Sequence, residues 1–307
     1  MFLINEPDGF PNKAKKKLEK IGETYLSNDK FNNDCIKIIF IRLGFSIDSL
    51  FLDKYPNLTH IISPTTGLNH LDLEEINSRE IILISLKGKL DFLKEIYATS
   101  EHTLALTLAL MRNIPSATNS VKEGKWNRYP FKGSEINGKL VFILGYGRVG
   151  KQVSKLFESF GAKIIAYDVD KNVVPSHVLT SLKYGLSNAD IISIHLPLNN
   201  DNKGFLNMEL LSLIKKDAIL VNTSRGEILD QDVFFDYLKN KKIAGAAVDV
   251  LCNEPDPINN KLKEAIISLK DRLIVTPHIA GFTNESLSKV EEYVTDLLMN
   301  NLNDKSN

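Results

Sequence analysis

The 307-residue sequence has little that would tie it to nucleic acid, a membrane or an oxidising compartment. Its 38 basic residues balance 38 acidic ones, which argues against a charged surface for nucleic acid or anionic lipid. Two cysteines, Cys35 and Cys252, are too few for a disulfide framework and lack metal-ligand spacing, so we expect no metal site. No apolar run approaches the roughly 20 residues of a transmembrane helix, and MFLINEPDGF meets acidic residues too early for a secretory signal. We therefore expect a reduced, cytoplasmic, two-domain protein without nucleic-acid or membrane partners.

The first hundred residues alternate between short apolar runs and amphipathic segments. Strands are predicted for MFLIN, CIKIIFIRL, LTHIIS and EIILISL, and helices for PNKAKKKLEKIGE and DSLFLDKYP. This alternation favours an α/β unit with a parallel sheet. The lysines of the first helix are typical of a solvated helix face.

One long apolar helix is predicted for SEHTLALTLALMRNI, residues 100–114, with Ser100 as its N-cap and Pro115 closing it. A surface connection rich in glycine, proline and charge follows around Trp126. A second α/β pattern begins at Leu140, with strands predicted for LVFILG, KIIAYD, ADIISIHL, DAILVNT, IAGAAVDV and RLIVTPH. The amphipathic segment SLSKVEEYVTDLLMNNL predicts a final helix.

The segment LVFILGYGRVGKQV contains a G-x-G-x-x-G motif at Gly145, Gly147 and Gly150. The motif alone is weak, but here an apolar strand precedes it and an amphipathic helix follows it. Gly145 would permit a tight turn, Gly147 would let a pyrophosphate approach the backbone, and Gly150 would let helix and strand pack closely. The diphosphate would lie at the helix N-terminus, where N–H groups and the helix dipole favour negative charge.

The next predicted strand, KIIAYD, ends in Asp168, 18 residues after Gly150. A carboxylate near this spacing binds the adenosine ribose diol, and it repels a 2′-phosphate, which favours NAD over NADP. A surface aspartate that caps a turn is the alternative interpretation, and the neighbouring Lys171 weakens the selection against NADP.

Polar residues follow the later predicted strands at their carboxyl ends, the edge where a doubly wound sheet binds ligands. They are His195, Arg225, Asp249, Glu254 and His278. Each has an ordinary alternative role, such as an exposed loop acid or a histidine satisfied by a backbone carbonyl. Several of them at one edge favour a functional site.

These residue types suit hydride transfer to a carbonyl carbon. The developing alkoxide needs a proton donor, and histidine suits that role near neutral pH. A neighbouring carboxylate stabilises the imidazolium form, and an arginine can hold a substrate carboxylate and carbonyl oxygen by charge-assisted hydrogen bonds. We expect Ser224 and Gly226 to be small so that substrate and nicotinamide can both reach Arg225.

The chain resembles the D-isomer-specific 2-hydroxyacid dehydrogenase family, nearest to its D-3-phosphoglycerate dehydrogenase and glyoxylate/hydroxypyruvate reductase branches. The resemblance covers nearly the whole chain and rests on SEHTLALTLALMRNI, GKLVFILGYGRVG, VNTSRGEILD, IAGAAVDVLCNEP and TPHIAGFTNES, which occur in family order and spacing. In that family the Arg of S-R-G, the Glu before the proline of E-P and the His of T-P-H-I form the catalytic set. The resemblance therefore implies catalytic roles for Arg225, Glu254 and His278.

The resemblance also implies an α/β architecture of two Rossmann-like domains with doubly wound parallel sheets, the NAD domain being inserted into the substrate domain. Residues 1–99 and 283–307 would form the substrate (catalytic) domain, and residues 100–282 the NAD-binding domain. The loop SPTTGLNH would offer backbone N–H groups of Thr66 and Gly67 to the substrate carboxylate.

The same match implies which residues line NAD, with Asp249 facing the nicotinamide carboxamide. The implied set, beyond the three motif glycines and Asp168, is Arg148, Val149, His195, Leu196, Pro197, Thr223, Ser224, Asp249 and Gly281.

The implied function is interconversion of a small D-2-hydroxy acid and its 2-keto acid, with 3-phosphoglycerate, hydroxypyruvate or glyoxylate as candidates and a homodimer as the expected assembly. An NAD(H)-sensing protein, like the family's co-repressors, is an alternative on the same fold, and formate oxidation is a third that no residue here selects. In PLNNDNKGF, Asn202 and Lys203 replace the usual threonine before the glycine. Because the sequence ends soon after the last predicted helix, we expect no C-terminal regulatory domain.

Overall fold

The computed structural model describes residues 1–304, which form two compact units. Unit 1 comprises Met1–Glu95 together with the C-terminal segment from Phe282, and unit 2 comprises Ile96–Gly281. Among the described residues, no helix is both long and apolar enough to cross a membrane.

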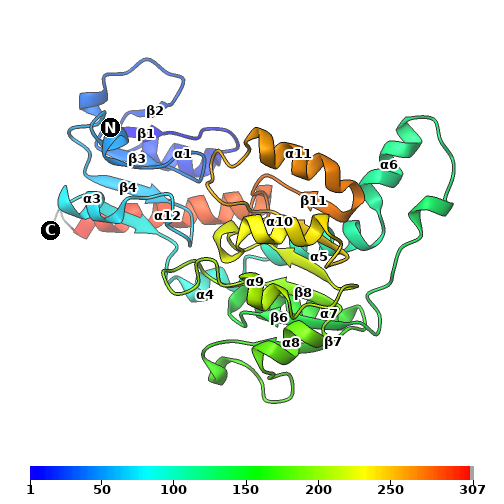
Figure 1. The fold of residues 1–307 in the computed structure, drawn as a ribbon. Helices are drawn as coiled ribbons and strands as arrows, with labels where there is room; N and C mark the ends of the chain where they lie inside the picture. Colours follow the sequence, from blue (N-terminus) through cyan, green and yellow to red (C-terminus); the bar gives the residue numbers. More distant parts are fainter. Residues whose placement is uncertain (305–307) are drawn as a thin grey trace. The chain divides into compact units, whose positions relative to one another are not determined.

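Unit 1 is a parallel five-stranded sheet in the order β2-β1-β3-β4-β5 (Figure 1). Its elements are β1 (Phe2–Ile4), α1 (Asn12–Glu19), β2 (Thr24–Leu26), η1 (Asn33–Cys35), β3 (Ile38–Phe40), α2 (Ser49–Leu52), β4 (His60–Ser63), α3 (Leu73–Ser78), β5 (Ile82–Ser85), α4 (Leu90–Leu93) and α12 (Asn284–Asp304). The edge strand β2 was not predicted, because its three residues are only half-buried and show no apolar run.

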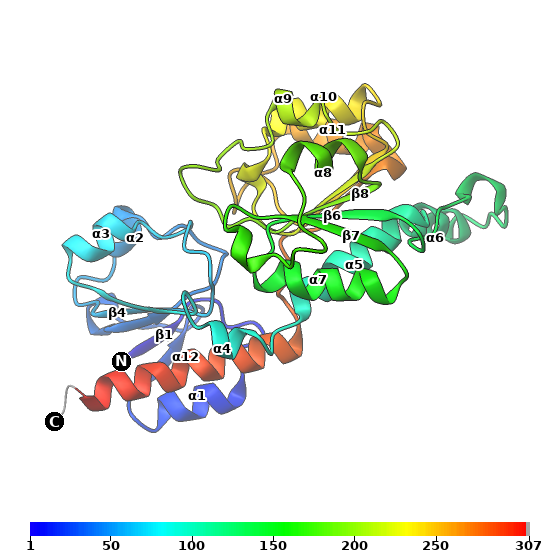
Figure 2. The same ribbon diagram turned by 90° about the horizontal axis from the view of Figure 1, so that it is seen from below.

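Helices cover both faces of the unit 1 sheet. Figure 2 shows α1 and α12 together on one face and α2 and α3 on the other. Two lysines of α1 pair with α12, since Lys13 binds Glu292 at 2.5 Å and Lys17 binds Asp296. The basic first helix is thus a solvated face paired with a neighbouring acidic helix.

Unit 2 is a parallel six-stranded sheet in the order β11-β10-β9-β8-β6-β7. Its elements are α5 (Ala98–Met111), α6 (Ile114–Lys122), η2 (Tyr129–Phe131), β6 (Leu140–Leu144), α7 (Arg148–Ser159), β7 (Lys163–Tyr167), η3 (Lys171–Val173), α8 (Leu182–Asn188), β8 (Ile191–Ile194), α9 (Met208–Leu211), β9 (Ile219–Asn222), η4 (Gly226–Ile228), α10 (Gln231–Lys239), β10 (Gly245–Val248), α11 (Asn260–Leu269), η5 (Lys270–Arg272) and β11 (Leu273–Val275). A single parallel bridge between Ala166 and Leu179 lies beyond β7, where a Rossmann sheet has its third strand.

Strand β6 shows why this sheet is buried on both faces. Val141 and Ile143 point to the core beneath α5 and α7, whereas Phe142 and Leu144 point to the core beneath α8, α10 and α11. Figure 2 shows these two helical layers on opposite sides of the sheet. The predicted α/β class with two doubly wound parallel sheets is confirmed.

The prediction of one helix over residues 100–114 is wrong at both ends. Helix α5 begins at Ala98 and its N-cap is Tyr97, while Ser100 lies within the first turn and its Oγ donates to the Tyr97 carbonyl at 2.6 Å. Pro115 lies in the first turn of α6, where a missing N–H costs no helical hydrogen bond. Asn113, at a φ of 53°, makes the turn between the two helices.

Candidate active site

The predicted site residues of unit 2 lie at one edge of its sheet. Because all six strands are parallel, the segments that follow β6, β8, β9, β10 and β11 leave the sheet at the same edge. These segments carry the glycine motif, His195, Arg225, Asp249 and Glu254, and His278, respectively.

The structure joins Glu254 and His278 directly. Glu254 Oε2 lies 2.5 Å from His278 Nδ1, and Glu254 Oε1 accepts from the Leu251 N–H at 3.1 Å. Since an ionised carboxylate only accepts, His278 donates through Nδ1–H. The Nε2 atom is therefore the ring position left to exchange a proton with a substrate.

Asp249 organises the segment that carries His278. Its Oδ1 accepts from Thr276 Oγ1 at 2.5 Å and from the Ile279 N–H at 2.9 Å, and its Oδ2 accepts from the Ala280 N–H at 2.8 Å. Burial alone would raise the pKa of Asp249, but hydrogen bonds from His102, Thr276, Ile279 and Ala280 outweigh burial and hold the pKa below its usual value. The carboxylate predicted to face the cofactor is thus already bound to its own loop.

Arg225 follows β9 in a turn built by Asn222. The buried Asn222 accepts from the Ser224 N–H and Oγ at 3.0 and 2.7 Å, and its Nδ2 donates to the Arg225 carbonyl at 2.9 Å. The Arg225 guanidinium donates to the Ser224 carbonyl at 2.6 Å. Burial lowers the pKa of Arg225, whereas the negative charges of Glu254 and Glu227 raise it. Arg225 therefore lies within electrostatic reach of the Glu254–His278 pair.

The structure gives Gly226 a packing role that the sequence did not reveal. A Cβ at Gly226 would lie 2.0 Å from the carbonyl carbon of Leu251 and 2.5 Å from the Cys252 nitrogen. The glycine is therefore required by close packing of the loops after β9 and β10. Ser224 is likewise occupied in the Asn222 turn.

The glycine motif has the local geometry of a dinucleotide loop. Gly145 has a φ of +95°, and a Cβ there would lie 2.6 Å from the His195 carbonyl oxygen. A Cβ at Gly150 would lie 2.1 Å from the Gly145 carbonyl oxygen. At Gly147, the N-cap of α7, a Cβ would meet no described atom within 4 Å, so protein packing does not require this glycine. A phosphate approaching the backbone would require it.

Asp168 lies beside that loop, and its side chain supports it. Its Oδ2 accepts from the Tyr146 N–H at 2.8 Å and its Oδ1 from the Asp170 N–H at 3.1 Å. The neighbouring Arg148 turns its guanidinium to the Ile96 carbonyl at 2.9 Å, and burial lowers its pKa. Arg148 can therefore contact a dinucleotide through its backbone while its side chain is bound elsewhere.

His195 turns inward from the end of β8. Its Nε2 lies 2.8 Å from Ser193 Oγ, and burial lowers the pKa of His195 to about 3, so the ring is neutral at pH 7. Leu196 packs against the hydrophobic core, and Pro197 is exposed, its carbonyl accepting from Asn202 Nδ2. Asn202, which departs from the family pattern, thus closes the loop after β8.

The other predicted residues lie in both units. Thr223 is buried and its Oγ1 lies 2.8 Å from Thr103 Oγ1, Val149 packs in the core beneath α7, and Gly281 is exposed. Thr66 and Gly67 belong to unit 1, in the loop after β4, which Thr65 shapes by donating to the Gly67 carbonyl at 2.9 Å.

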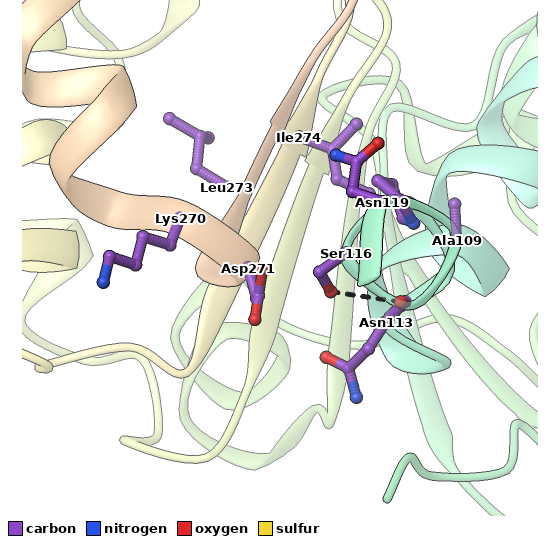
Figure 3. Close-up of a pocket in the computed structure, with 9 residues that line it drawn as sticks. Ala109, Asn113, Ser116, Asn119, Lys270, Asp271, Leu273 and Ile274 are labelled. Atoms are coloured by element: carbon purple, nitrogen blue, oxygen red, sulfur yellow. Dashed lines mark hydrogen bonds between the residues drawn. The ribbon is translucent and has the colours of Figure 1, made fainter. Parts of the chain in front are cut away.

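A pocket of about 230 Å³ lies elsewhere in unit 2. Figure 3 shows its lining residues, including Asn113 just before α6, Ser116 from α6, and Lys270 and Asp271 from η5. Since η5 precedes β11, this pocket lies at the edge opposite His278 and is separate from the candidate site. Within residues 1–304, no group of three His, Cys, Asp or Glu side chains could hold a metal ion.

Three residues of the site were missed from the sequence: Asn222, Thr276 and His102. Asn222 carried a usable signal, because an asparagine at the end of a strand is typical of an Asx turn. Thr276 and His102 carried none, since the structure alone brings helix α5 against the end of β11, with His102 Nε2 3.1 Å from Thr276 Oγ1.

Comparison with known proteins adds family membership to this geometry. Residues 104–280 match the D-isomer specific 2-hydroxyacid dehydrogenase, NAD binding domain. The chain is 35% identical to a glyoxylate reductase of Thermofilum pendens over 80% of this chain and 72% of that protein. It is 32% identical to a D-3-phosphoglycerate dehydrogenase of Methanocaldococcus jannaschii over 93% of this chain and 55% of that protein.

The fold matches solved structures over nearly its full length. A D-lactate dehydrogenase of Aquifex aeolicus, complexed with NAD and lactic acid, has a TM-score of 0.81 at 24% identity, over 99% of this chain and 96% of that one. The chain spans only about half the length of the phosphoglycerate dehydrogenases that it matches, 55% in the archaeal case above. The predicted family is confirmed: the chain is an NAD-dependent oxidoreductase of the D-isomer specific 2-hydroxyacid dehydrogenase family.

Proposed function

We propose that this chain interconverts a small D-2-hydroxy acid and its 2-keto acid, with Arg225, Glu254 and His278 as its catalytic residues. The observation that carries this proposal is the 2.5 Å contact between Glu254 and His278, in electrostatic reach of Arg225. Bound NAD supplies or accepts the hydride at its nicotinamide ring.

His278 and Glu254 handle the proton. In reduction, His278 Nε2–H donates to the oxygen of the carbonyl as that oxygen becomes an alkoxide, and in oxidation the same atom accepts the hydroxyl proton. The Glu254 carboxylate stabilises the imidazolium and keeps Nδ1–H facing away from the substrate. These two residues form one acid–base unit.

Arg225 handles the negative charge of the substrate. Its guanidinium presents planar donors that can hold the carboxylate and polarise the neighbouring carbonyl. Glu254 and Glu227 partly offset the effect of burial on its pKa, which keeps it charged. Partial burial strengthens its interaction with an anionic substrate, because the local dielectric is low.

The cofactor residues follow from the glycine loop. The N-terminus of α7, together with Gly145, Gly147 and Gly150, would hold the diphosphate, and Asp168 the adenosine ribose. Leu196, Pro197, Thr223, Ser224, Asp249 and Gly281, with Arg148, Val149 and His195, complete the proposed cofactor set. We assign residues 100–282 to the NAD-binding domain and residues 1–99 with 283–307 to the substrate domain.

The substrate domain would bind the carboxylate through the loop after β4. Within the described residues, neither the Thr66 nor the Gly67 N–H donates a hydrogen bond, so both are available. Glyoxylate and hydroxypyruvate, the substrates named in the relatives, fit a site with one carboxylate anchor. Lys13 and Lys17 of α1 are already bound to acidic residues of α12, so these two lysines do not favour a phosphorylated substrate.

The test is a steady-state assay with NADH and a panel of 2-keto acids: glyoxylate, hydroxypyruvate, pyruvate and 3-phosphohydroxypyruvate. We expect saturable turnover with at least one unphosphorylated acid. Binding of NADH without turnover of any acid would instead support the NAD(H)-sensing alternative, which no observation on this chain favours.

We also propose a cytoplasmic homodimer. Segment 112–139, which includes α6, carries exposed apolar side chains, with Trp126 91% and Tyr129 80% exposed, and Figure 1 shows α6 projecting from unit 2. Exposed aromatic residues on one segment favour a protein interface. Light scattering on the wild type and on the double variant Trp126→Ala/Tyr129→Ala tests this, with a monomeric wild type as the contrary result.

A further inference from the structure

Two consecutive residues of α5 bind the loops that carry the proposed catalytic residues. Thr103 Oγ1 lies 2.8 Å from Thr223 Oγ1, two residues before Arg225, and His102 Nε2 lies 3.1 Å from Thr276 Oγ1, two residues before His278. Helix α5 packs against β9, β10 and β11 of the same unit. It therefore contacts two loops of the site without contributing a residue to the proposed chemistry.

The direction of the His102 hydrogen bond follows from its neighbours. Thr276 Oγ1 lies 2.5 Å from Asp249 Oδ1, and an ionised carboxylate can only accept, so the threonine hydroxyl donates its one proton there. The threonine oxygen must then accept from His102, which requires a proton on His102 Nε2. His102 Nε2 is also 3.5 Å from Asp249 Oδ1, so its N–H dipole favours the negative charge of that carboxylate.

The orientation of Asp249 controls the conformation at His278. His278 has a φ of 52°, a left-handed conformation that is strained for a residue other than glycine. Its N–H donates to the carbonyls of Asp249 and Thr276, while the next two N–H groups donate to the Asp249 carboxylate. The strained turn persists because Asp249 binds it at several points.

We propose that His102 is a positioning residue that acts through Thr276 and Asp249 to hold His278 where its Nε2 can reach the substrate oxygen. This inference rests on the proposed function, in which His278 exchanges the proton. His102 touches neither the Glu254 carboxylate nor the ring of His278 in any contact of the structure, so its effect is on geometry.

The first test compares His102→Leu, His102→Gln and His102→Asn, because a glutamine amide nitrogen approximates the position of histidine Nε2 and an asparagine nitrogen that of Nδ1. We expect kcat to fall about tenfold in the Leu and Asn variants, as for loss of one hydrogen bond, and to stay within about twofold in the Gln variant. KM for NADH should not change. Thr107→Val is the control, since Thr107 Oγ1 binds only a carbonyl of its own helix, at 2.8 Å.

The second test is a double-mutant cycle with Thr276→Val, which removes the hydroxyl and keeps the shape. If the two residues act in one chain of hydrogen bonds, His102→Leu/Thr276→Val will be no slower than the slower single variant. Independent effects that multiply in the double variant, or a His102→Leu enzyme with wild-type kcat, would overturn the inference.

A readout that does not depend on activity is NMR of the imidazole ring nitrogens in the wild-type protein. We expect His102 to carry its proton on Nε2, and a proton on Nδ1 alone would overturn the inference. If the wild type turned over no 2-keto acid while this tautomer was observed, the proposed function would fail and the hydrogen-bonded arrangement would stand, so the two failures are distinguishable.

Discussion

At the carboxyl edge of the unit 2 sheet, buried Asp249 binds backbone N–H groups and a threonine hydroxyl. At the corresponding edge of unit 1, Glu6 binds the N–H groups of Arg42 and Gly44, and Glu291 binds the Arg42 guanidinium itself at 2.5 Å. Both sheets are doubly wound and parallel, and both place an acid beside the loop of a neighbouring strand. The two edges differ in what the acids bind.

In unit 2 Asp249 holds the loop through its backbone N–H groups and the Thr276 hydroxyl. In unit 1 the guanidinium is itself the partner of a carboxylate that is 1% exposed. Burial raises the pKa of Glu291 while Arg42 lowers it, so each charge depends on the other. The two edges thus use an acid differently, because Asp249 orders the backbone of a loop whereas Glu291 pairs with an arginine side chain.

The largest expected effect is that of Arg225→Ala. We expect kcat/KM for the keto acid to fall about 10³-fold, since the variant loses charge-assisted hydrogen bonds to the reacting groups. The affinity for NADH, measured by fluorescence titration, should not change. Arg79→Ala in unit 1, which loses only exposed contacts to Asp53 and Glu75, is the control. A loss of less than tenfold in the Arg225 variant would contradict its assignment.

The unit 1 pair should matter for stability instead. Glu291→Ala leaves the Arg42 charge buried without its carboxylate, and we expect a loss of about 3 kcal/mol in the free energy of unfolding, measured by urea titration. The double variant Arg42→Met/Glu291→Leu should recover most of that loss. Glu292→Ala, which breaks a surface pair with Lys13, should leave the urea midpoint of unfolding unchanged. If Glu291→Ala also left it unchanged, the contrast between the two edges would disappear.

The charge of Asp168 should set the cofactor preference. Asp168→Asn keeps an acceptor for the Tyr146 N–H but removes the negative charge that repels a 2′-phosphate. We expect the ratio of kcat/KM with NADH to that with NADPH to fall about tenfold, or about 1.4 kcal/mol. Asp170→Asn, two residues further along, should keep the wild-type ratio. An unchanged ratio in the Asp168 variant would show that Asp168 supports the glycine loop but does not select the cofactor.

The last prediction concerns His195 and pH. Its pKa is about 3 in the folded protein, against a usual value of 6.5, so the unfolded chain binds one more proton between these values. The stability that its neutral form contributes is present above pH 6.5 and is lost as pH falls toward 3, by at most about 1.4 kcal/mol per pH unit. His195→Gln should flatten the decline in unfolding midpoint between pH 6.5 and 5. The exposed His177→Gln should leave the decline unchanged, and an equal slope in wild type and His195→Gln would refute a ring held neutral by the fold.

Much of the fold was predictable because its signals are local. The apolar runs of the unit 2 strands and the glycine motif each depend on neighbours in sequence. Strands β6 and β7 lie where they were predicted, and a helix, α7, follows the motif as expected. The ends of α5 were predicted wrongly. Ser100 and Pro115 are typical of a helix start and a helix end, but they lie in the first turns of α5 and α6. The helix propensity of single residues fixes the ends of a helix less strongly than tertiary packing does.

The sequence by itself determined the α/β class, the dinucleotide motif and the family, since strand periodicity, glycine spacing and the order of motifs are properties of neighbouring residues. Only the tertiary structure decided what each side chain binds. Gly226 is small because the Leu251 backbone lies against it. Arg42 is paired because α12 carries Glu291 to it. His102 contacts Thr276, in the loop of His278, although the two residues are 174 positions apart in the chain. Such contacts join segments that are distant in sequence. They arise from close packing and from the pairing of buried polar groups in three dimensions, so no pattern of neighbouring residues predicts them.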